Sequence, residues 1–491
     1  MLGLAAGGCR TLPPAAPPPL SAEDVRLAQA LAHYAQGLLC EGEEGLRSAA
    51  ALEHFERTAA LDPACGRAWS RAAVTALRRG EFERAVAALE RACRLDSRSS
   101  RAWLDLAAGY QIAGRLPEAQ RAYRRAAALA PRDSTAYLAL ANIAVHEQRL
   151  DEALEILDRG CRRATNAAPL LAFCQAQGAR LYSQGDPTGA VACLEFVAAR
   201  QVENRARLYY WIGEIHEQQG QRSAAVGAYT LSSLQEPPLP QAFVRLALLY
   251  FELNPAEALN ILREGQRRLP DNLLILLATA ELHTSLKRFR EAVEVYDRMV
   301  SLAGQSSETR LTPAFYLNFG AVCDRAGLTN KTEQVLENAL KLYPDAPEVL
   351  NYLAYGWAER NVRLEEALDY VRRALQKEPD NGAYVDTLGW VYYRQGKYTE
   401  ALLQIQRAAE LIPDDPTIVE HLGDVYQALG RREEALEHWK RSFILQPGNG
   451  AVAAKLEAAG LNPAELLPAA ARRTEAGAEA AAGPQTPPAA R

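Results

Sequence analysis

The sequence is short of the features that mark several common classes of protein. It has no run of about 18 apolar residues, so it predicts no membrane-spanning helix. Aromatic residues make up only 7%, so alanine and leucine are expected to fill most of the core. A net charge of −5 and a pI near 6.0 argue against a nucleic-acid-binding surface. Other proteins are therefore the expected partners.

Motifs that carry chemistry are also missing. The sequence has no H-E-x-x-H, no G-x-S-x-G and no G-x-x-x-x-G-K-[ST] motif. His146-Glu147 and His216-Glu217 lack a second ligand at helical spacing, which favours polar residues on a helix surface over zinc ligands. The stretch Gly448-Asn449-Gly450 is interpreted as a helix C-cap. The sequence therefore predicts no catalytic residue, no cofactor and no metal site, and it indicates a protein that is not an enzyme.

Cysteine usage gives no sign of a redox or metal motif. The eight cysteines include no C-x-x-C pair. Half of them fall at helical positions where a small apolar side chain suffices, and these are expected to serve packing: Cys93, Cys161, Cys193 and Cys323. Disulfide connectivity is not readable from a sequence, so the disulfide state stays open.

Proline, in contrast, recurs with a period of about 34 residues, a length typical of helical repeat proteins. The intervals are 35, 34 and 34 residues between Pro344, Pro379, Pro413 and Pro447. Each period holds two apolar stretches at helical spacing, split by a short polar turn such as Gln395-Gly396-Lys397. Each period therefore predicts a helical hairpin. Its proline ends the second helix because it cannot donate the next backbone hydrogen bond.

The spacing inside each period resembles the tetratricopeptide repeat (TPR), with its W-x2-L-G-x2-Y, A-x3-F and P pattern. One nearly full match consists of Trp103, Leu106, Ala107, Tyr110, Ala119, Tyr123, Ala126 and Pro131. The resemblance covers most of the chain and is weakest in the middle. It implies an all-α fold, a TPR α-solenoid in which about twelve helix-turn-helix repeats form a right-handed superhelix with a concave groove.

The pattern also predicts the organisation of the chain. We expect a lipobox-like start with a Pro-rich linker (1–20), an N-terminal TPR array that is degenerate in its middle (21–303) and a joint loop (304–312). A C-terminal TPR array (313–447), a capping helix (448–467) and a disordered tail (468–491) are expected to follow.

The C-terminal repeats carry the acidity of the chain, with 18 acidic against 12 basic residues from Asp345 to Pro447. The resemblance implies that first-helix positions line the groove, here Asn351, Tyr355, Asp386, Trp390, Arg394, Glu420 and Asp424. The resemblance also implies that Arg67, Ser70 and Arg101, farther up the chain, lie on the same face. We expect the C-terminal groove to bind an extended segment carrying lysine or arginine, with aromatic anchors and acidic partners. In the alternative, these residues are solvated and the binding surface lies elsewhere.

The start of the sequence raises a separate possibility. The run from Leu4 to Cys9 resembles a bacterial lipobox, in which a lipidated cysteine follows small residues, although Ala6 stands where leucine is usual. Only eight residues precede Cys9, so a complete signal requires a start upstream of Met1. The resemblance implies lipid attachment at Cys9 and a place in the cell envelope, on the periplasmic face of the outer membrane.

Two functions follow from these observations. The first is a scaffold for protein-protein interaction in a bacterial envelope assembly, which binds partner segments in its groove. The alternative is a cytoplasmic TPR adaptor or regulatory module. Partner identity, pathway and oligomeric state are not readable from the sequence.

Overall fold

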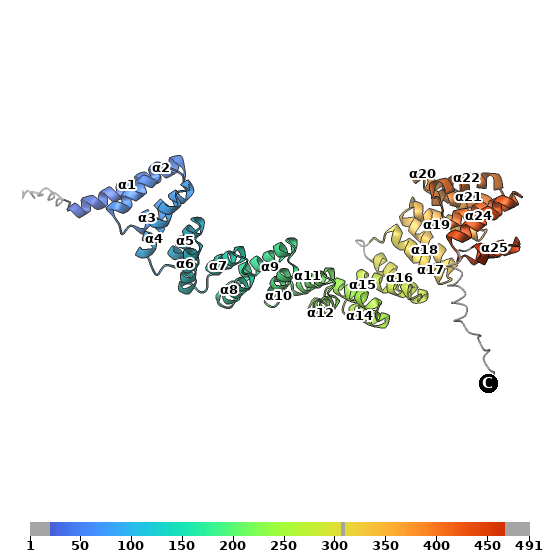
Figure 1. Ribbon diagram of the computed structural model, residues 1–491, viewed down its shortest axis with the longest axis horizontal. Coiled ribbons are helices and arrows are strands. Elements are labelled where there is room, and N and C mark those ends of the chain that lie inside the picture. Colours follow the sequence, from blue (N-terminus) through green and yellow to red (C-terminus); the bar gives the residue numbers. More distant parts are fainter. Residues whose placement is uncertain (1–19, 306–309, 467–491) are drawn as a thin grey trace, which may run out of the picture. The chain divides into compact units, whose positions relative to one another are not determined.

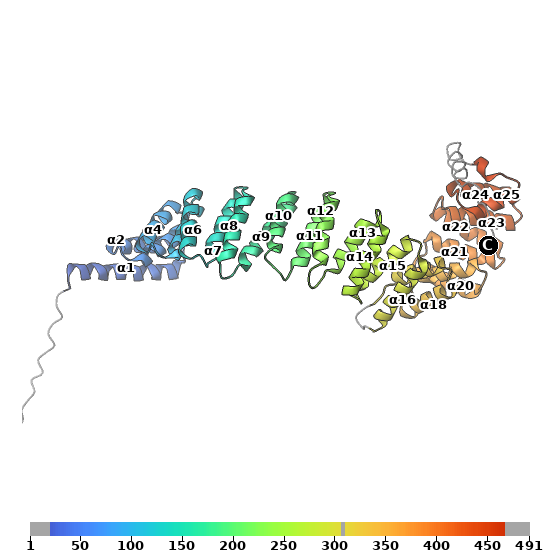
Figure 2. The same cartoon turned by 90° about the horizontal axis from the view of Figure 1, so that it is seen from below.

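The structure is a computed structural model that describes residues 20–305 and 310–466. Within these ranges the regular elements are 25 α-helices and one short 3-10 helix, with no strand. Helices follow one another as hairpins (Figure 1), and Figure 2 shows the successive pairs of the N-terminal part side by side. The predicted all-α solenoid is therefore confirmed. No helix in the described ranges is long and apolar enough to cross a membrane.

The chain divides into two compact units, Met1–Leu249 (unit 1) and Tyr250–Arg491 (unit 2). The sequence placed a joint at 304–312 instead, and helix α16 (Phe289–Gln305) covers the beginning of that segment. Residues 306–309 of the predicted joint lie outside the described residues. The same is true of Cys9 and of the predicted tail 468–491.

Unit 1 is built from hairpins of consecutive helices. Its helices are α1 (Ala22–Glu44), α2 (Ala49–Leu61), α3 (Gly66–Arg79), α4 (Phe82–Leu95), α5 (Ser100–Ile112), α6 (Leu116–Leu129), α7 (Thr135–His146), α8 (Leu150–Arg163), α9 (Ala168–Ser183), α10 (Pro187–Ala198), α11 (Arg205–Gln218) and α12 (Arg222–Ser233). Helix α13 (Pro240–Phe251) begins in unit 1 and runs past its last residue.

Unit 2 repeats the same construction. Its helices are α14 (Pro255–Arg268), α15 (Leu273–Ser285), α16 (Phe289–Gln305), α17 (Pro313–Arg325), α18 (Thr329–Leu342), α19 (Pro347–Glu359), α20 (Leu364–Lys377), α21 (Gly382–Arg394), α22 (Tyr398–Leu411), α23 (Pro416–Ala428), α24 (Arg432–Leu445) and α25 (Gly450–Ala458). A 3-10 helix at Pro463–Leu466 follows α25.

The hairpin of α21 and α22 shows how the sequence builds one repeat. Asn381 caps α21 by accepting backbone hydrogen bonds, and Gly396 supplies the left-handed turn conformation (φ 77°) between the helices. A Cβ at Gly389 would lie 2.4 Å from the side chain of Ile405, so only glycine lets the two helices pack this closely. Ala401 and Ile405 are fully buried in the resulting contact. Small residues thus set the helix spacing and large ones fill the interior.

The last helix covers the apolar end of the preceding hairpin in unit 2. Val452 and Leu456 of α25 are fully buried against the preceding hairpin. The interpretation of residues 448–450 as a C-cap was wrong, because Asn449 instead N-caps α25 by accepting hydrogen bonds from Ala451 and Val452. The missed signal is the position of an asparagine immediately before an apolar helical run.

The seven cysteines in the described ranges are free thiols. Cys93, Cys193 and Cys323 are buried and Cys161 is half-buried, as expected for packing positions.

Candidate functional site

The predicted groove residues lie on the first helices of three consecutive hairpins in unit 2, namely α19, α21 and α23. Asn351, Tyr355, Arg394, Glu420 and Asp424 are half-buried. Asp386 and Trp390 are only 5% and 6% exposed, so the expectation that both present themselves to a partner was wrong. They lie beneath the surface and hold the three helices together.

Asp386 forms an ion pair with a residue that the sequence reading missed, His421 of α23. The Nδ1 atom of His421 lies 3.0 Å from both carboxylate oxygens of Asp386, and its side chain is nearly inaccessible. The indole ring of Trp390 stacks on the imidazole of His421, with 3.9 Å between ring centroids. The ring of Tyr393 also stacks on Trp390, with 4.6 Å between ring centroids. The indole Nε1 of Trp390 donates to Glu359 at 2.5 Å. The stack therefore links α19, α21 and α23.

Glu420 and Asp424 also have an internal cation. The Nζ atom of Lys455, on the capping helix α25, donates to both carboxylates at 2.7 Å. Asn449 donates to the second oxygen of Glu420 at 2.9 Å, and the indole of Trp439 donates to Asp424 at 2.9 Å. The sequence analysis did not predict a role for Lys455, since this lysine lies outside the repeats, on the capping helix.

The electrostatic character of this region is negative. Burial alone would lower the pKa of the His421 imidazole, but the charge and hydrogen bond of Asp386, with Asp424 and Glu359, raise it. Burial would likewise lower the pKa of Lys455, and the carboxylates of Asp424 and Glu420 raise it. For both cations the field of the surrounding carboxylates outweighs the loss of solvent.

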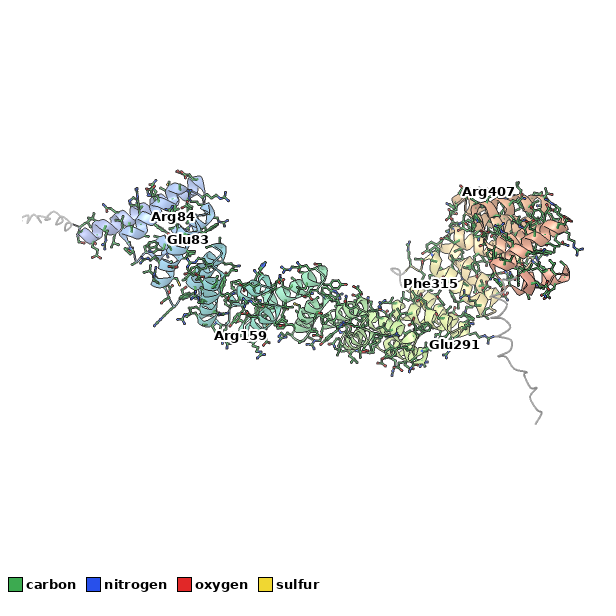
Figure 3. All side chains as sticks on the ribbon, viewed as in Figure 1. Glu83, Arg84, Arg159, Glu291, Phe315 and Arg407 are labelled. Atoms are coloured by element: carbon green, nitrogen blue, oxygen red, sulfur yellow. The ribbon has the colours of Figure 1, made fainter. Side chains whose placement is uncertain are left out.

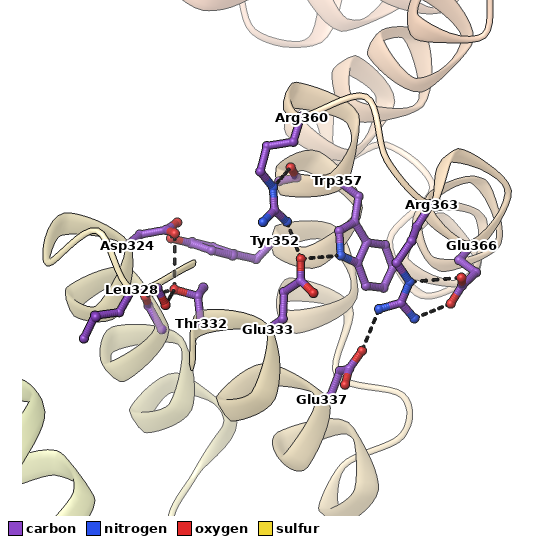
Figure 4. Close-up of polar contacts among 12 residues, drawn as sticks. Asp324, Leu328, Thr332, Glu333, Glu337, Tyr352, Trp357, Arg360, Arg363 and Glu366 are labelled. Atoms are coloured by element: carbon purple, nitrogen blue, oxygen red, sulfur yellow. Dashed lines mark hydrogen bonds and ion pairs between the residues drawn. The ribbon is translucent and has the colours of Figure 1, made fainter. Parts of the chain in front are cut away.

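A cleft of about 350 Å³ adjoins these residues between α17, α18 and α19. Tyr355 and Glu359 line it together with Tyr352, whose hydroxyl donates to Asp324 at 2.8 Å. Figure 4 shows this contact and two hydrogen bonds nearby. In these, Glu333 accepts from the indole of Trp357 at 3.1 Å and from the guanidinium of Arg360 at 2.5 Å. The charged side chains that line the cleft are mostly acidic, namely Asp324, Glu333 and Glu359 against Arg360, and the ion pair between Arg360 and Glu333 fixes two of them.

One polar atom in this region has no internal partner. The buried Oδ1 atom of Asn351, one turn before Tyr355 on α19, accepts no hydrogen bond. Burial, followed by the charges of Glu359, Asp386 and further carboxylates, raises the pKa of Tyr355. The neutral phenol of the half-buried Tyr355 can donate a hydrogen bond to a peptide backbone, whereas the amide oxygen of Asn351 is buried.

The N-terminal residues predicted for the groove also lie together. Arg67, Ser70 and Arg101 line a cleft of about 820 Å³ between the first helices α3 and α5. Arg101 forms an ion pair with Asp105 at 3.0 Å, and both side chains are well exposed. This cleft carries charges of both signs, in contrast to the acidic cleft of unit 2. In the residues described, no three His, Cys, Asp or Glu side chains are grouped in a way that could hold a metal ion.

Solved structures similar to the chain are helical repeat proteins with low sequence identity. Yeast Tom70 is 15% identical, with 88% of this chain and 95% of that chain covered and a TM-score of 0.34. The Cut9 and Hcn1 hetero-tetramer of APC/C is 14% identical, with coverages of 90% and 96% and a TM-score of 0.37. PilW, a type IV pilus biogenesis factor, is 18% identical, covers 44% of this chain and 98% of its own, and has a TM-score of 0.36.

The repeats themselves are matched at the level of sequence. The TPR repeat-containing protein PA4667 of Pseudomonas aeruginosa is 38% identical over 65 residues, which is 13% of this chain and 11% of that protein. The family described as Tetratricopeptide repeat matches residues 44–100, 104–169, 176–238, 245–307 and 333–383, and the TPR repeat family matches 389–430. These matches cover more than half of the chain and include both units. The chain therefore belongs to the tetratricopeptide-repeat family.

Proposed function

We propose that the protein is a non-enzymatic scaffold that binds an extended partner segment bearing lysine or arginine along the first helices of unit 2. The tetratricopeptide fold itself supports a role in protein-protein interaction. The observation that carries the finer proposal is the excess of carboxylates over internal cations. Glu359, Asp386, Glu420 and Asp424 converge there, and His421 and Lys455 are the cations they contact.

The burial of these side chains decides which of them would contact the partner. Trp390 and Asp386 are buried, so they position the helices, and the half-buried Tyr355 with the exposed Glu359 forms the accessible part. Glu359 uses one oxygen for the indole of Trp390, and its second oxygen is available to a lysine or arginine. A partner cation would thus complete a charge distribution that the chain itself leaves negative.

The test is the binding of fluorescein-labelled decalysine to the full chain, measured by fluorescence anisotropy. Replacing both Glu359→Gln and Glu420→Gln is expected to raise Kd by about three- to tenfold, because Glu359 loses an exposed ion pair with the partner and Glu420 loses its share of the surrounding negative charge. Glutamine keeps the hydrogen bonds to Trp390 and Asn449, so the fold is retained. The matched control is Glu400→Gln with Glu410→Gln, two exposed acids of α22. Equal losses from both pairs would reduce the binding to general charge attraction and remove the proposed site.

We further propose that the scaffold is attached to the cell envelope through Cys9, which lies outside the described residues. The support is the lipobox-like run that ends at Cys9. Expression from the genomic locus in cells given radiolabelled palmitate tests it. Label that disappears in Cys9→Ala supports the anchor, and unlabelled protein favours the cytoplasmic adaptor.

A further inference from the structure

Seven of the second helices carry an arginine 28 residues after the turn position that proline usually holds, or 29 residues after it in the case of Arg373. In unit 2 this arginine is held by the turn. Arg407 donates through Nη2 to the carbonyl of Pro379 at 3.0 Å and to the carboxylate of Asp380 at 2.8 Å. Other members of the series contact their own turns in the same way, as Arg298 does at Pro270, Arg373 at Pro344 and Arg441 at Asp414.

In three turns of unit 1, those at Pro63, Ser97 and Pro131, the turn carbonyl is occupied by a different donor. The residue six positions after the turn proline position is aromatic, and its ring N–H or hydroxyl donates to that carbonyl. The pairs are Trp69 with Pro63 (3.2 Å), Trp103 with Ser97 (2.9 Å) and Tyr137 with Pro131 (3.5 Å). In unit 2 the same position holds an aliphatic residue with no donor, such as Leu276, Leu350 or Val385.

The acidic partner is missing from these unit 1 turns as well. The residue after the turn position is aspartate in the unit 2 series, but it is Ala64, Arg98 or Arg132 in unit 1. The corresponding arginines of unit 1 are Arg91, Arg125 and Arg159, which we call the arginine ladder. All three side chains are exposed, and they have no hydrogen bond or ion pair with any residue in the described ranges. Figure 3 labels one arginine of each series, Arg159 in unit 1 and Arg407 in unit 2.

Two of the ladder arginines stand at clefts of similar construction. Arg125 lines a cleft of about 640 Å³ between α4, α5 and α6, with Trp103 and Tyr110 in its wall. Arg159 lines a cleft of about 490 Å³ between α6, α7 and α8, with Tyr137 in its wall. Each cleft thus combines an unpaired guanidinium with an aromatic side chain, and the arrangement recurs after one repeat of 34 residues.

We propose that the arginine ladder binds an extended acidic segment of a partner protein. An unpaired guanidinium binds carboxylates through two parallel hydrogen bonds, and a spacing of one arginine per repeat suits an extended chain better than a single ion. Nucleic acid is the less favoured partner because residues 1–249 contain 28 arginines and no lysine against 26 acidic residues, which is a local stripe and not a broad positive field. This surface lies in a different unit and attracts the opposite charge from the site proposed above, so neither proposal depends on the other.

The experiment uses the full chain and fluorescein-labelled decaglutamate, followed by fluorescence anisotropy. The variant Arg91→Gln with Arg125→Gln and Arg159→Gln is expected to raise Kd about tenfold, because it removes three exposed ion pairs of modest strength. The matched control changes Arg298, Arg373 and Arg407 to glutamine, which removes the same number of charges from the arginines of unit 2 that donate to a turn carbonyl. The control should bind decaglutamate like the unaltered chain.

Each result decides the proposal. Absence of decaglutamate binding to the unaltered chain would overturn it, as would an equal loss in the ladder variant and the control. Decathymidylate and phosphatidylglycerol vesicles are measured in parallel. Tighter ladder-dependent binding of either one would assign the surface to nucleic acid or membrane and overturn an acidic protein partner. Circular dichroism of the ladder variant should match the unaltered chain, since its arginines form no hydrogen bond or ion pair with the residues that the structure describes.

Discussion

The two units use one position of the same repeat in opposite ways. In unit 2 the turn carbonyl and its aspartate hold an arginine of the following second helix, as Pro379 and Asp380 hold Arg407. In unit 1 an aromatic side chain occupies the turn carbonyl, as Trp103 does at Ser97, and the arginine stays free. The residue six positions after the turn therefore differs between the repeats that pair this arginine internally and those that leave it exposed.

The units also differ in how far their charged side chains are paired internally. In unit 2, several carboxylates form ion pairs within the unit: Asp386 pairs with His421, and Glu420 and Asp424 pair with Lys455. In unit 1 the ladder arginines have no such partner in the described ranges. These ion pairs are thus expected to contribute to the stability of unit 2, whereas the ladder arginines of unit 1 are expected to contribute to binding.

The largest difference between the units is expected when a buried aromatic of unit 2 is removed. Trp390→Ala should cost about 3–5 kcal/mol, because it leaves a cavity between His421, Tyr393 and Glu359. Trp103→Ala in unit 1 should cost only about 1–2 kcal/mol, since that ring is half-buried and loses one hydrogen bond. Hydrogen exchange of the helices in each unit measures both costs. Similar costs would show that the two aromatics have the same structural role.

A smaller effect is expected from the capping lysine. Lys455→Gln should lower the free energy of unfolding of unit 2 by about 2 kcal/mol, because two carboxylates lose a charged hydrogen-bond donor. The same change should strengthen decalysine binding, since Glu420 and Asp424 become available to a partner cation. Urea unfolding and fluorescence anisotropy measure the two effects on one sample. The matched control is Lys440→Gln on α24, a lysine with no such pair, and weaker decalysine binding in Lys455→Gln would contradict the proposed site.

The pH dependence of unit 2 should reveal the buried histidine. The pKa of His421 is raised above its ordinary value of 6.5, so its stabilising contribution is fully present below that pH and is lost as pH rises through the folded-state pKa. Burial lowers the pKa of His283 and His438, whose contributions have the opposite sign. The difference in melting temperature between the unaltered chain and His421→Gln should therefore shrink as pH rises from 6 to 9. A difference that stays constant with pH would show that folding does not raise the pKa of His421.

The sequence predicted the architecture well because the repeat is a local signal. Recurring prolines and small residues such as Gly389 define each hairpin without knowledge of its neighbours. The site was less predictable because it depends on contacts between repeats. His421 was missed because its partner Asp386 is 35 residues away, and Lys455 because it comes from a helix outside the repeats. The burial of Trp390 also follows from stacking by a neighbouring repeat, which spacing within one repeat does not reveal.

The smallest expected effect tests the cause of the difference between the units. Trp103→Val installs the kind of residue that unit 2 has at this position, Val385, and frees the carbonyl of Ser97. Arg125 can then donate to that carbonyl as Arg407 does in unit 2, and decaglutamate binding should weaken by about two- to threefold, the contribution of one exposed ion pair. In a background of Arg125→Gln, Trp103→Val should have no further effect on Kd, because the arginine through which it acts is gone. Additive losses in this double-mutant cycle would show that Trp103 contacts the acidic segment directly, and the turn carbonyl would then have no control over the ladder.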